Sequence, residues 1–235
     1  MGRVFEKRKH TMFARFDKMA KGFTKIGKEI AIAIKQGGAD PGGNPRLRAA
    51  IQNAKAINMP KDRVDAAIKR ASSKEEKDFE ESIFEGYGPY GIAMLIECAS
   101  DNNTRTVANI RMYFSRANGA LGTNGSVAFM FERKGVFKID DTGKDIEELE
   151  LDLIDHGLEE INKDEDGTII YTDFVDMGRM QKALEEKHIP IFSTAKQRFP
   201  ATTVELNEAQ QAEINALIEK FEDDDDVQAV YHNMK

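Results

Sequence analysis

The chain has 235 residues, of which 40% are hydrophobic, 32% are charged and one is cysteine, and its formal net charge is −7 at pH 7. This length allows one large domain or two to three small ones, and the apolar content excludes disorder throughout. There is no apolar run near the roughly 18 residues of a membrane span, and the N-terminus lacks the apolar region of a secretion signal. We therefore expect a cytoplasmic protein that has no membrane partner.

The net charge hides a strong asymmetry along the sequence. Residues 1–77 carry 19 Lys and Arg against 8 Asp and Glu, a balance of +11, whereas the other 158 residues carry 15 against 33, a balance of −18. A segment this basic concentrates phosphate groups around it and releases their counterions on contact. The asymmetry predicts a polyanionic partner for the first third of the chain.

The basic segment has the apolar spacing of helices. Apolar residues recur at three- and four-residue intervals from Met12 to Ile34, and Gly37-Gly38 supplies a stop. Asn44, followed by proline, has the residue type of a helix cap, so a second helix is expected there. A third begins after Met59-Pro60. These patterns predict a small helical bundle with a basic exterior.

From residue 78 onward the pattern changes to alternating strands and helices. The outer part is predicted as β-α-β-β-α-β, with strands at 92–99, 127–131, 202–206 and 227–231 and helices at 104–118 and after Asn207. The stretch between its halves repeats that order. The predicted fold class is α+β, an N-terminal helical bundle followed by two ferredoxin-like α+β domains, the second inserted in the first. The predicted domains are residues 1–77, residues 78–134 plus 201–235, and residues 135–200.

Cationic side chains are the main candidates for nucleic-acid contact. Nearby acids are too few to neutralise the first group, whose density suits phosphate contact without sequence reading. The alternative is a solvated helix face, because exposed helix positions favour Lys and Arg in any case. The first group is Arg3, Lys7, Arg8, Lys9, Arg15, Lys18, Lys21, Lys25 and Lys28, and a second group on the later helices is Arg46, Arg48, Lys55, Lys61, Lys69 and Arg70.

Residues 86–91 spell G-x-G-x-x-G, the glycine pattern of a dinucleotide-binding loop. That loop needs a strand before it and a helix after it, whereas here a strand follows, so a structural turn is predicted. Tyr87 and Tyr90 would stack on unpaired bases if they are exposed. Asn103 or Thr104 is expected to act as a simple cap of the next helix; the alternative is that Arg105 and the backbone N–H groups there receive a phosphate.

Catalysis and metal binding find little support in the sequence. The four histidines lie in separate contexts without metal-ligand spacing, and no serine or cysteine sits in a recognised nucleophile turn. Cys98 lies in an apolar run, which fits a buried thiol. The acidic run Asp223–Asp226 is expected to be a solvated loop, because consecutive carboxylates do not converge on an ion. We predict no catalytic residue, no metal site and no cofactor.

Longer blocks of the sequence resemble the YebC/PmpR family, and the likeness runs nearly from end to end. The resemblance implies a helical domain followed by two α+β domains, the second inserted in the first. Members are commonly described as transcriptional regulators that bind DNA, and related proteins, including the mitochondrial activator of cytochrome oxidase translation, act on ribosomes. The blocks are Asn44–Ile51, Asn58–Asp62, Glu85–Pro89, Leu121–Thr123, Gly125–Phe129, Thr202–Val204 and Val230–Asn233.

These observations predict a non-enzymatic regulator of gene expression that binds nucleic acid; they leave its oligomeric state open, with a monomer slightly favoured. Its target is either DNA, as for a transcriptional regulator, or ribosomal RNA within the ribosome, as for a translation factor. The second gains support because no helix-turn-helix recognition helix is obvious and because a cationic front suits a cleft in ribosomal RNA. A third reading, a small-molecule sensor or enzyme, would need a concave pocket with convergent polar groups.

Overall fold

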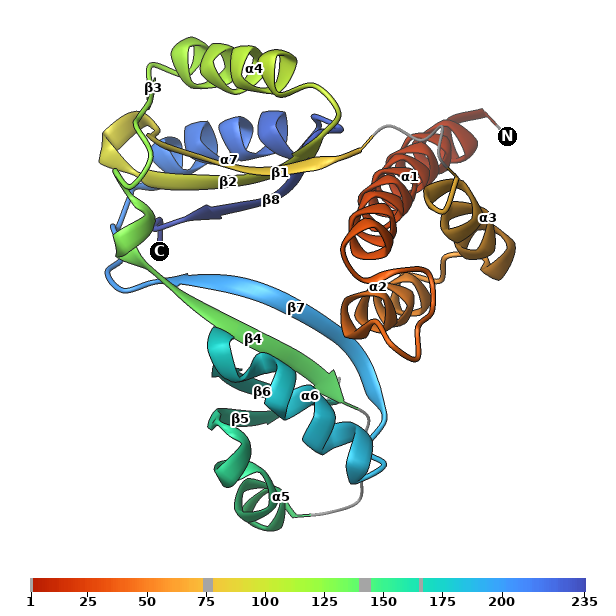
Figure 1. Cartoon of the computed structure of the whole chain (residues 1–235). Coiled ribbons are helices and arrows are strands. Elements are labelled where there is room, and N and C mark those ends of the chain that lie inside the picture. The colour runs from red at the N-terminus through yellow and green to blue at the C-terminus, as the bar shows by residue number, and fades with distance from the viewer. Residues whose placement is uncertain (1, 74–77, 140–144, 165–166) are drawn as a thin grey trace. The chain divides into compact units, whose positions relative to one another are not determined.

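The computed structural model describes residues 2–73, 78–139, 145–164 and 167–235, with side chains from Met19 onward (Figure 1). The chain forms two compact units, residues 1–79 and residues 80–235, which we call the helical unit and the α+β unit. Within the described residues, no helix has the length and apolar character to cross a membrane.

The helical unit consists of α1 (Gly2–Gly37), α2 (Pro45–Ala56) and α3 (Lys61–Ala71). The predicted cap, Asn44, is buried and accepts a hydrogen bond from the backbone N–H of Leu47 at 3.0 Å. Its amide also donates to the carbonyl oxygens of Ala33 and Gly38, at 2.7 and 2.8 Å. One side chain thus starts α2 and ties it to the last turn of α1 and to the residue that follows α1.

The first sheet of the α+β unit has the strand order β3-β1-β2-β8, with antiparallel neighbours. Met94, Ile96 and Cys98 of β2 face the two helices, whereas Ala93 and Leu95 belong to a second apolar cluster. The central strand is therefore buried on both faces, and Cys98 is a buried free thiol as predicted. The elements are β1 (Glu80–Tyr87), β2 (Ala93–Ser100), α4 (Asn103–Arg116), β3 (Ala120–Leu121), α7 (Glu208–Glu222) and β8 (Val227–His232).

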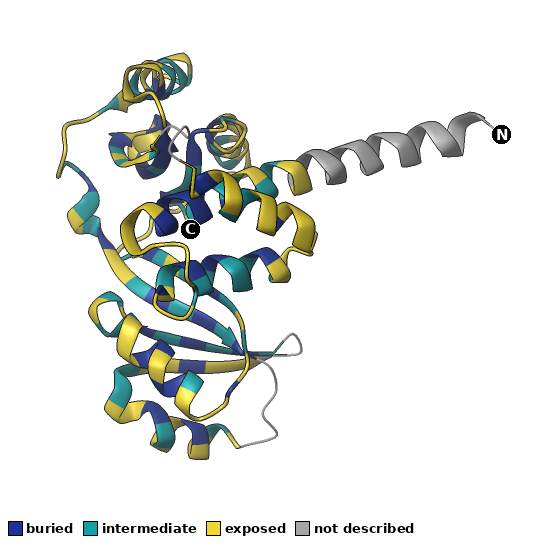
Figure 2. Ribbon diagram, turned by 45° about the vertical axis from the view of Figure 1, so that its right-hand side comes forward, coloured by how far each residue is buried: buried dark blue, intermediate teal, exposed yellow. Residues whose placement is uncertain are grey.

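The second sheet, with the order β5-β6-β4-β7, lies in sequence between β3 and α7. Phe137 and Ile170 pack beneath α5 and α6, and Figure 2 shows buried residues on the strands and on the helix faces against them. The predicted order β-α-β-β-α-β is the order found. The elements are β4 (Phe131–Ile139), α5 (Ile146–Leu153), β5 (Leu158–Asp164), β6 (Gly167–Asp173), α6 (Met177–Glu186) and β7 (Ile191–Pro200), with short 3-10 helices at Pro89–Gly91, Ala128–Met130, Ile154–His156 and Phe174–Asp176.

The fold class predicted from the sequence is confirmed, but two strands of the first sheet were placed wrongly. The predicted strand at 127–131 is a 3-10 helix leading into β4, and the predicted strand at 202–206 makes a single bridge, between Val204 and Met234. Their two places in the sheet are taken by β3 and β1. β1 lies between β2 and β3, as β6 lies between β4 and β5 in the second sheet. The two sheets therefore share one arrangement of neighbours. The finer boundaries of the three predicted domains stay a prediction.

The buried carboxylate of Glu85 on β1 holds the chain at the start of the predicted strand 127–131, which is therefore not extended there. It accepts hydrogen bonds from the backbone N–H groups of Gly125, Val127 and Ala128, each at 2.7 Å. Burial works to raise the pKa of Glu85, but these three donors and the positive charge of Arg198 outweigh it and leave the pKa below its ordinary value. The segment curls around one ionised side chain.

A first prediction follows from this pKa. A carboxylate with a lowered folded pKa stabilises the fold above its unfolded pKa, near 4.5 for Glu85, and that contribution is lost as the pH falls through the folded value. Glu85→Gln should lower the free energy of unfolding at neutral pH by about 2 kcal/mol, because its amide donor faces other donors. On acidification, the free energy of unfolding of Glu85→Gln should also fall less than that of the unaltered chain, because the variant has no carboxylate to protonate at this position.

Urea unfolding at neutral pH and below the ordinary glutamate pKa measures both effects. Glu219→Gln, on the exposed side of α7, is the matched control and should follow the unaltered chain. Equal acid sensitivity in both variants would contradict the role given to Glu85.

Candidate nucleic-acid interface

The first group of predicted contact residues lies on α1. Six of its members precede the part of α1 whose side chains are described: Arg3, Lys7, Arg8, Lys9, Arg15 and Lys18. Lys21 and Lys25 are half-buried. Lys28 is only 8% exposed, and its ammonium group lies 5.3 Å from the centre of the Phe79 ring. Lys28 therefore stands over an aromatic face rather than on the open basic face predicted for it.

The second group contains two arginines that form hydrogen bonds within the helical unit and four residues that are exposed. Arg48 Nη1 donates to the carbonyl oxygens of Pro41 and Gly42, at 2.7 and 3.0 Å, and so holds the loop before α2. Arg46 Nη1 donates to Gln36 Oε1 at 2.6 Å. The other four residues are exposed on α2 and α3, namely Lys55, Lys61, Lys69 and Arg70.

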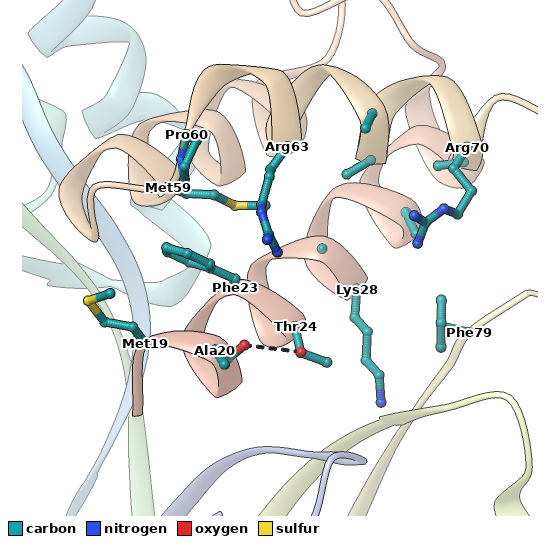
Figure 3. Close-up of a pocket in the computed structure, with 15 residues that line it drawn as sticks. Met19, Ala20, Phe23, Thr24, Lys28, Met59, Pro60, Arg63, Arg70 and Phe79 are labelled. Carbon is teal, nitrogen blue, oxygen red and sulfur yellow. Dashed lines mark hydrogen bonds between the residues drawn. The ribbon is translucent and has the colours of Figure 1, made fainter. Parts of the chain in front are cut away.

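A groove of about 870 Å³ lies between α1 and α3, and we call it the α1–α3 groove. Phe23 of α1 and Met59, just before α3, contribute apolar side chains to it, and Arg63 and Arg70 line it from α3 (Figure 3). The sequence did not single out Arg63. The only signal for it is the seven-residue spacing to Arg70, which places both guanidinium groups on one side of the helix.

The glycine-rich segment 86–91 is the hairpin turn between β1 and β2, as predicted, and no helix opens at its end. Tyr87 and Tyr90 are 39% and 45% exposed. The Tyr90 hydroxyl donates to Glu213 Oε2 at 2.7 Å, and this hydrogen bond to a carboxylate raises the pKa of Tyr90. The Tyr87 hydroxyl lies 3.4 Å from the carbonyl oxygen of Ser126. Both rings are accessible, but a carboxylate lies beside Tyr90.

The Arg105 guanidinium group forms ion pairs with two carboxylates of the fold. Its Nη2 lies 2.8 Å from Asp226 Oδ2 and 3.0 Å from Asp101 Oδ1, and Asp226 is buried. The helix cap is Asn102, whose side chain accepts from the backbone N–H of Arg105 at 3.1 Å, and neither Asn103 nor Thr104 has that role. The contact proposed for Arg105 is replaced by an ion pair within the fold.

The acidic run Asp223–Asp226 is only in part the solvated loop that the sequence predicted, because Asp223 and Asp225 are exposed whereas Asp226 is buried and Asp224 is half-buried. Asp224 Oδ2 accepts hydrogen bonds from Asn109 Nδ2 and the Tyr113 hydroxyl, each at 3.0 Å. Burial, followed by the bond to Asp224, raises the pKa of Tyr113 to about 12. These carboxylates fasten α4 to the end of α7. Among the described residues, no group of three or more His, Cys, Asp and Glu is placed to hold a metal ion.

Profiles of one protein family match nearly the whole chain. Residues 3–74 match the TACO1/YebC protein N-terminal domain, and residues 79–234 match the TACO1/YebC second and third domain. The chain belongs to the TACO1/YebC family. The resemblance read from the sequence blocks is thereby confirmed.

Relatives within the TACO1/YebC family are similar over their full length. A protein of Cytophaga hutchinsonii is 63% identical over 234 residues, covering 100% of this chain and 98% of that protein. One of Flavobacterium johnsoniae is 57% identical, covering 100% and 99%. Both are named "Probable transcriptional regulatory protein". The solved structure "Conserved Hypothetical Protein Aq1575" from Aquifex aeolicus is 36% identical with a TM-score of 0.77, covering 92% of this chain and 90% of that one.

The fastening of α4 gives a second prediction. Tyr113→Phe keeps the ring, which packs edge-on against Phe221 at 5.8 Å between ring centres, and removes only the hydroxyl that donates to Asp224. Losing a hydrogen bond to a charged acceptor should lower the free energy of unfolding by about 1–2 kcal/mol. Tyr87→Phe removes a hydroxyl from an exposed ring and should change the free energy of unfolding much less. Denaturant unfolding of both variants decides this, and equal stabilities would refute the structural role of Asp224.

Proposed function

We propose that this TACO1/YebC family protein is a non-enzymatic regulator of gene expression whose helical unit binds nucleic acid through phosphate contacts. The observation that carries the proposal is the charge division, +11 over residues 1–77 against −18 over the rest. Relatives named as probable transcriptional regulatory proteins support the same function.

The arrangement of cations in the helical unit adds support. Lys55, Lys61 and Lys69 are exposed, and within the described part of the chain neither Lys55 nor Lys61 forms an ion pair. Such side chains suit contacts with phosphate oxygens, which position a protein on nucleic acid without reading its sequence. In contrast, Arg48 holds the loop before α2 and Arg46 donates to Gln36 at the end of α1, so their contribution is chiefly to the electrostatic field around the unit.

Charge reversal on α1 is the direct test. Replacing Arg8, Lys9, Arg15 and Lys18 with Glu changes the net charge by −2 at each position, from −7 to −15. Because affinity for a polyanion depends on the number of phosphates neutralised, binding to genomic DNA or ribosomal RNA at low salt should fall by roughly a hundredfold or more.

The control reverses the same number of charges in the α+β unit, at Arg111, Arg116, Lys182 and Lys220, and reaches the same net charge. Filter binding at matched salt should show near-normal affinity for this control. Equal loss in both variants would mean that net charge alone governs binding, and unchanged affinity in the α1 variant would defeat the proposal.

Ribosomal RNA is the second candidate target, and the α1–α3 groove favours it. Sequence-specific RNA recognition mostly uses unpaired bases that lie against aromatic or guanidinium planes, and this groove contains both kinds of side chain. A duplex DNA target would use the guanidinium groups on its phosphates but would leave the aromatic side chains without a stacking partner.

Cosedimentation with ribosomes, run beside filter binding to genomic DNA at one salt concentration, separates the two targets. A transcriptional regulator should bind promoter duplexes well above its non-specific background. A translation factor should pellet with ribosomes at salt concentrations that release it from duplex DNA. We expect binding to DNA to be the stronger, and the opposite ranking would replace the first target with the second.

A further inference from the structure

The α1–α3 groove has an apolar floor. Met19 and Phe23 of α1, Met59 before α3 and Phe79 at the end of the helical unit contribute to it (Figure 3). The small side chain of Ala66 on α3 also lines it. Its volume of about 870 Å³ lies within the range of sites that hold small organic groups. An apolar hollow of this size on the most basic part of the chain suggests a ligand with an apolar part.

The ionisable groups of the groove all have one sign. Lys28, Arg63 and Arg70 line it, and the lining residues, all in the described part of the helical unit, include no Asp or Glu. Arg63 and Arg70 are seven residues apart on α3, so their backbone positions are separated by roughly 10 Å along the helix axis. That separation corresponds to about three nucleotides of a stacked strand, which rises about 3.4 Å per nucleotide.

We propose that the α1–α3 groove binds an unpaired nucleotide, with the base against Phe23 and Met59 and two phosphates of the same strand, about three nucleotides apart, on Arg63 and Arg70. This rests on the proposed function and makes it more specific. A phosphate gains nothing from an apolar floor, and a neutral apolar ligand gains nothing from the cations. A nucleotide outside a duplex has both a flat apolar face and an anionic backbone, and bases stack on aromatic and guanidinium planes.

Thr24 and Lys28 define where such a ligand meets α1. The Thr24 hydroxyl donates to the carbonyl oxygen of Ala20 at 3.1 Å within α1, so its donor is already used by the helix. The Lys28 ammonium group lies over Phe79 and adds positive charge close to the floor. The choice of the groove among nucleotides therefore depends on the shape and stacking of the base and on its phosphates more than on hydrogen bonds to base edges.

An acidic amphipathic protein segment has a similar combination of properties and is the competing occupant. The chain itself contains one on α5 and the turn after it, where Leu151 and Ile154 are 77% and 61% exposed among carboxylates. A peptide with the sequence of residues 146–155 is therefore the proper competitor in any binding test.

Filling the groove tests the proposal. Ala66 is exposed on α3, so Ala66→Leu occupies the groove without removing a cation or a core contact, and Ala108→Leu on the exposed side of α4 is its matched control. The probes are a labelled oligouridylate of about twelve nucleotides, within the site size of single-strand binders, and an adenine–uracil RNA duplex of equal length.

At one salt concentration, Ala66→Leu should bind the single strand about tenfold more weakly, which is the size of one lost stacking contact, and bind the duplex normally. Ala108→Leu should bind both probes normally. Equal binding of the single strand by Ala66→Leu and by its control would overturn the proposal. So would normal RNA binding combined with loss of binding to the peptide of residues 146–155.

Two double variants, each of which removes two positive charges from α3, supply a second measurement that does not depend on packing. Arg63→Gln with Arg70→Gln should weaken single-strand binding more than Lys61→Gln with Lys69→Gln, which removes the same charge from the same helix outside the groove lining. Equal losses would overturn the nucleotide site while leaving general phosphate binding intact. If the unaltered chain binds neither probe, the proposed function itself fails.

Discussion

Pairing between β2 and β8 is the constraint on which the α+β unit depends. Met94 to Cys98 of β2 pair with Val227 to His232, so residues on either side of the whole second sheet meet in one ladder. Because the cost of closing a loop rises only slowly with its length, a segment that forms its own core is tolerated between them. The second sheet is such a segment, since Phe137 and Ile170 are buried under its own helices.

Buried polar groups join the two sheets where the chain passes between them. Arg198 on β7 is 9% exposed and donates to Glu97 on β2 at 2.8 Å, and the Tyr231 hydroxyl donates to the carbonyl oxygen of Lys196 at 3.0 Å. Glu85 holds the departing chain in the same way. Carboxylates with these roles, together with Asp226, belong to the fold, so the negative balance of this unit is not simply an acidic surface open to partners.

The helices and the second sheet were predictable because each has a local signal: apolar spacing, the Asn44 cap, and alternation along the strands. The misplaced strands have a physical reason. Val127 and Phe131 are both buried in one cluster although a 3-10 turn separates them, so the apolar run between them has the composition of a strand without its conformation. β1 was missed because its apolar residue Ile83 is exposed and breaks the alternation expected of a half-buried strand. The partners Arg105 and Asp226 are 121 residues apart, and no local pattern joins them.

The structure changes the argument for nucleic-acid binding from the number of charges to their position. Lys28 is covered by Phe79 and Arg48 holds a loop, so part of the basic excess acts only through the field that draws a polyanion near. The cations of α3 beside the groove are different, because they lie next to an apolar surface. A phosphate bound to these cations would not cover that surface, which would stay in contact with water. Burying that surface favours a ligand that brings a base with its phosphate, and duplexes keep their bases stacked inside. We therefore expect the groove to add a contact with an unpaired base to the phosphate contacts through which the helical unit binds a duplex.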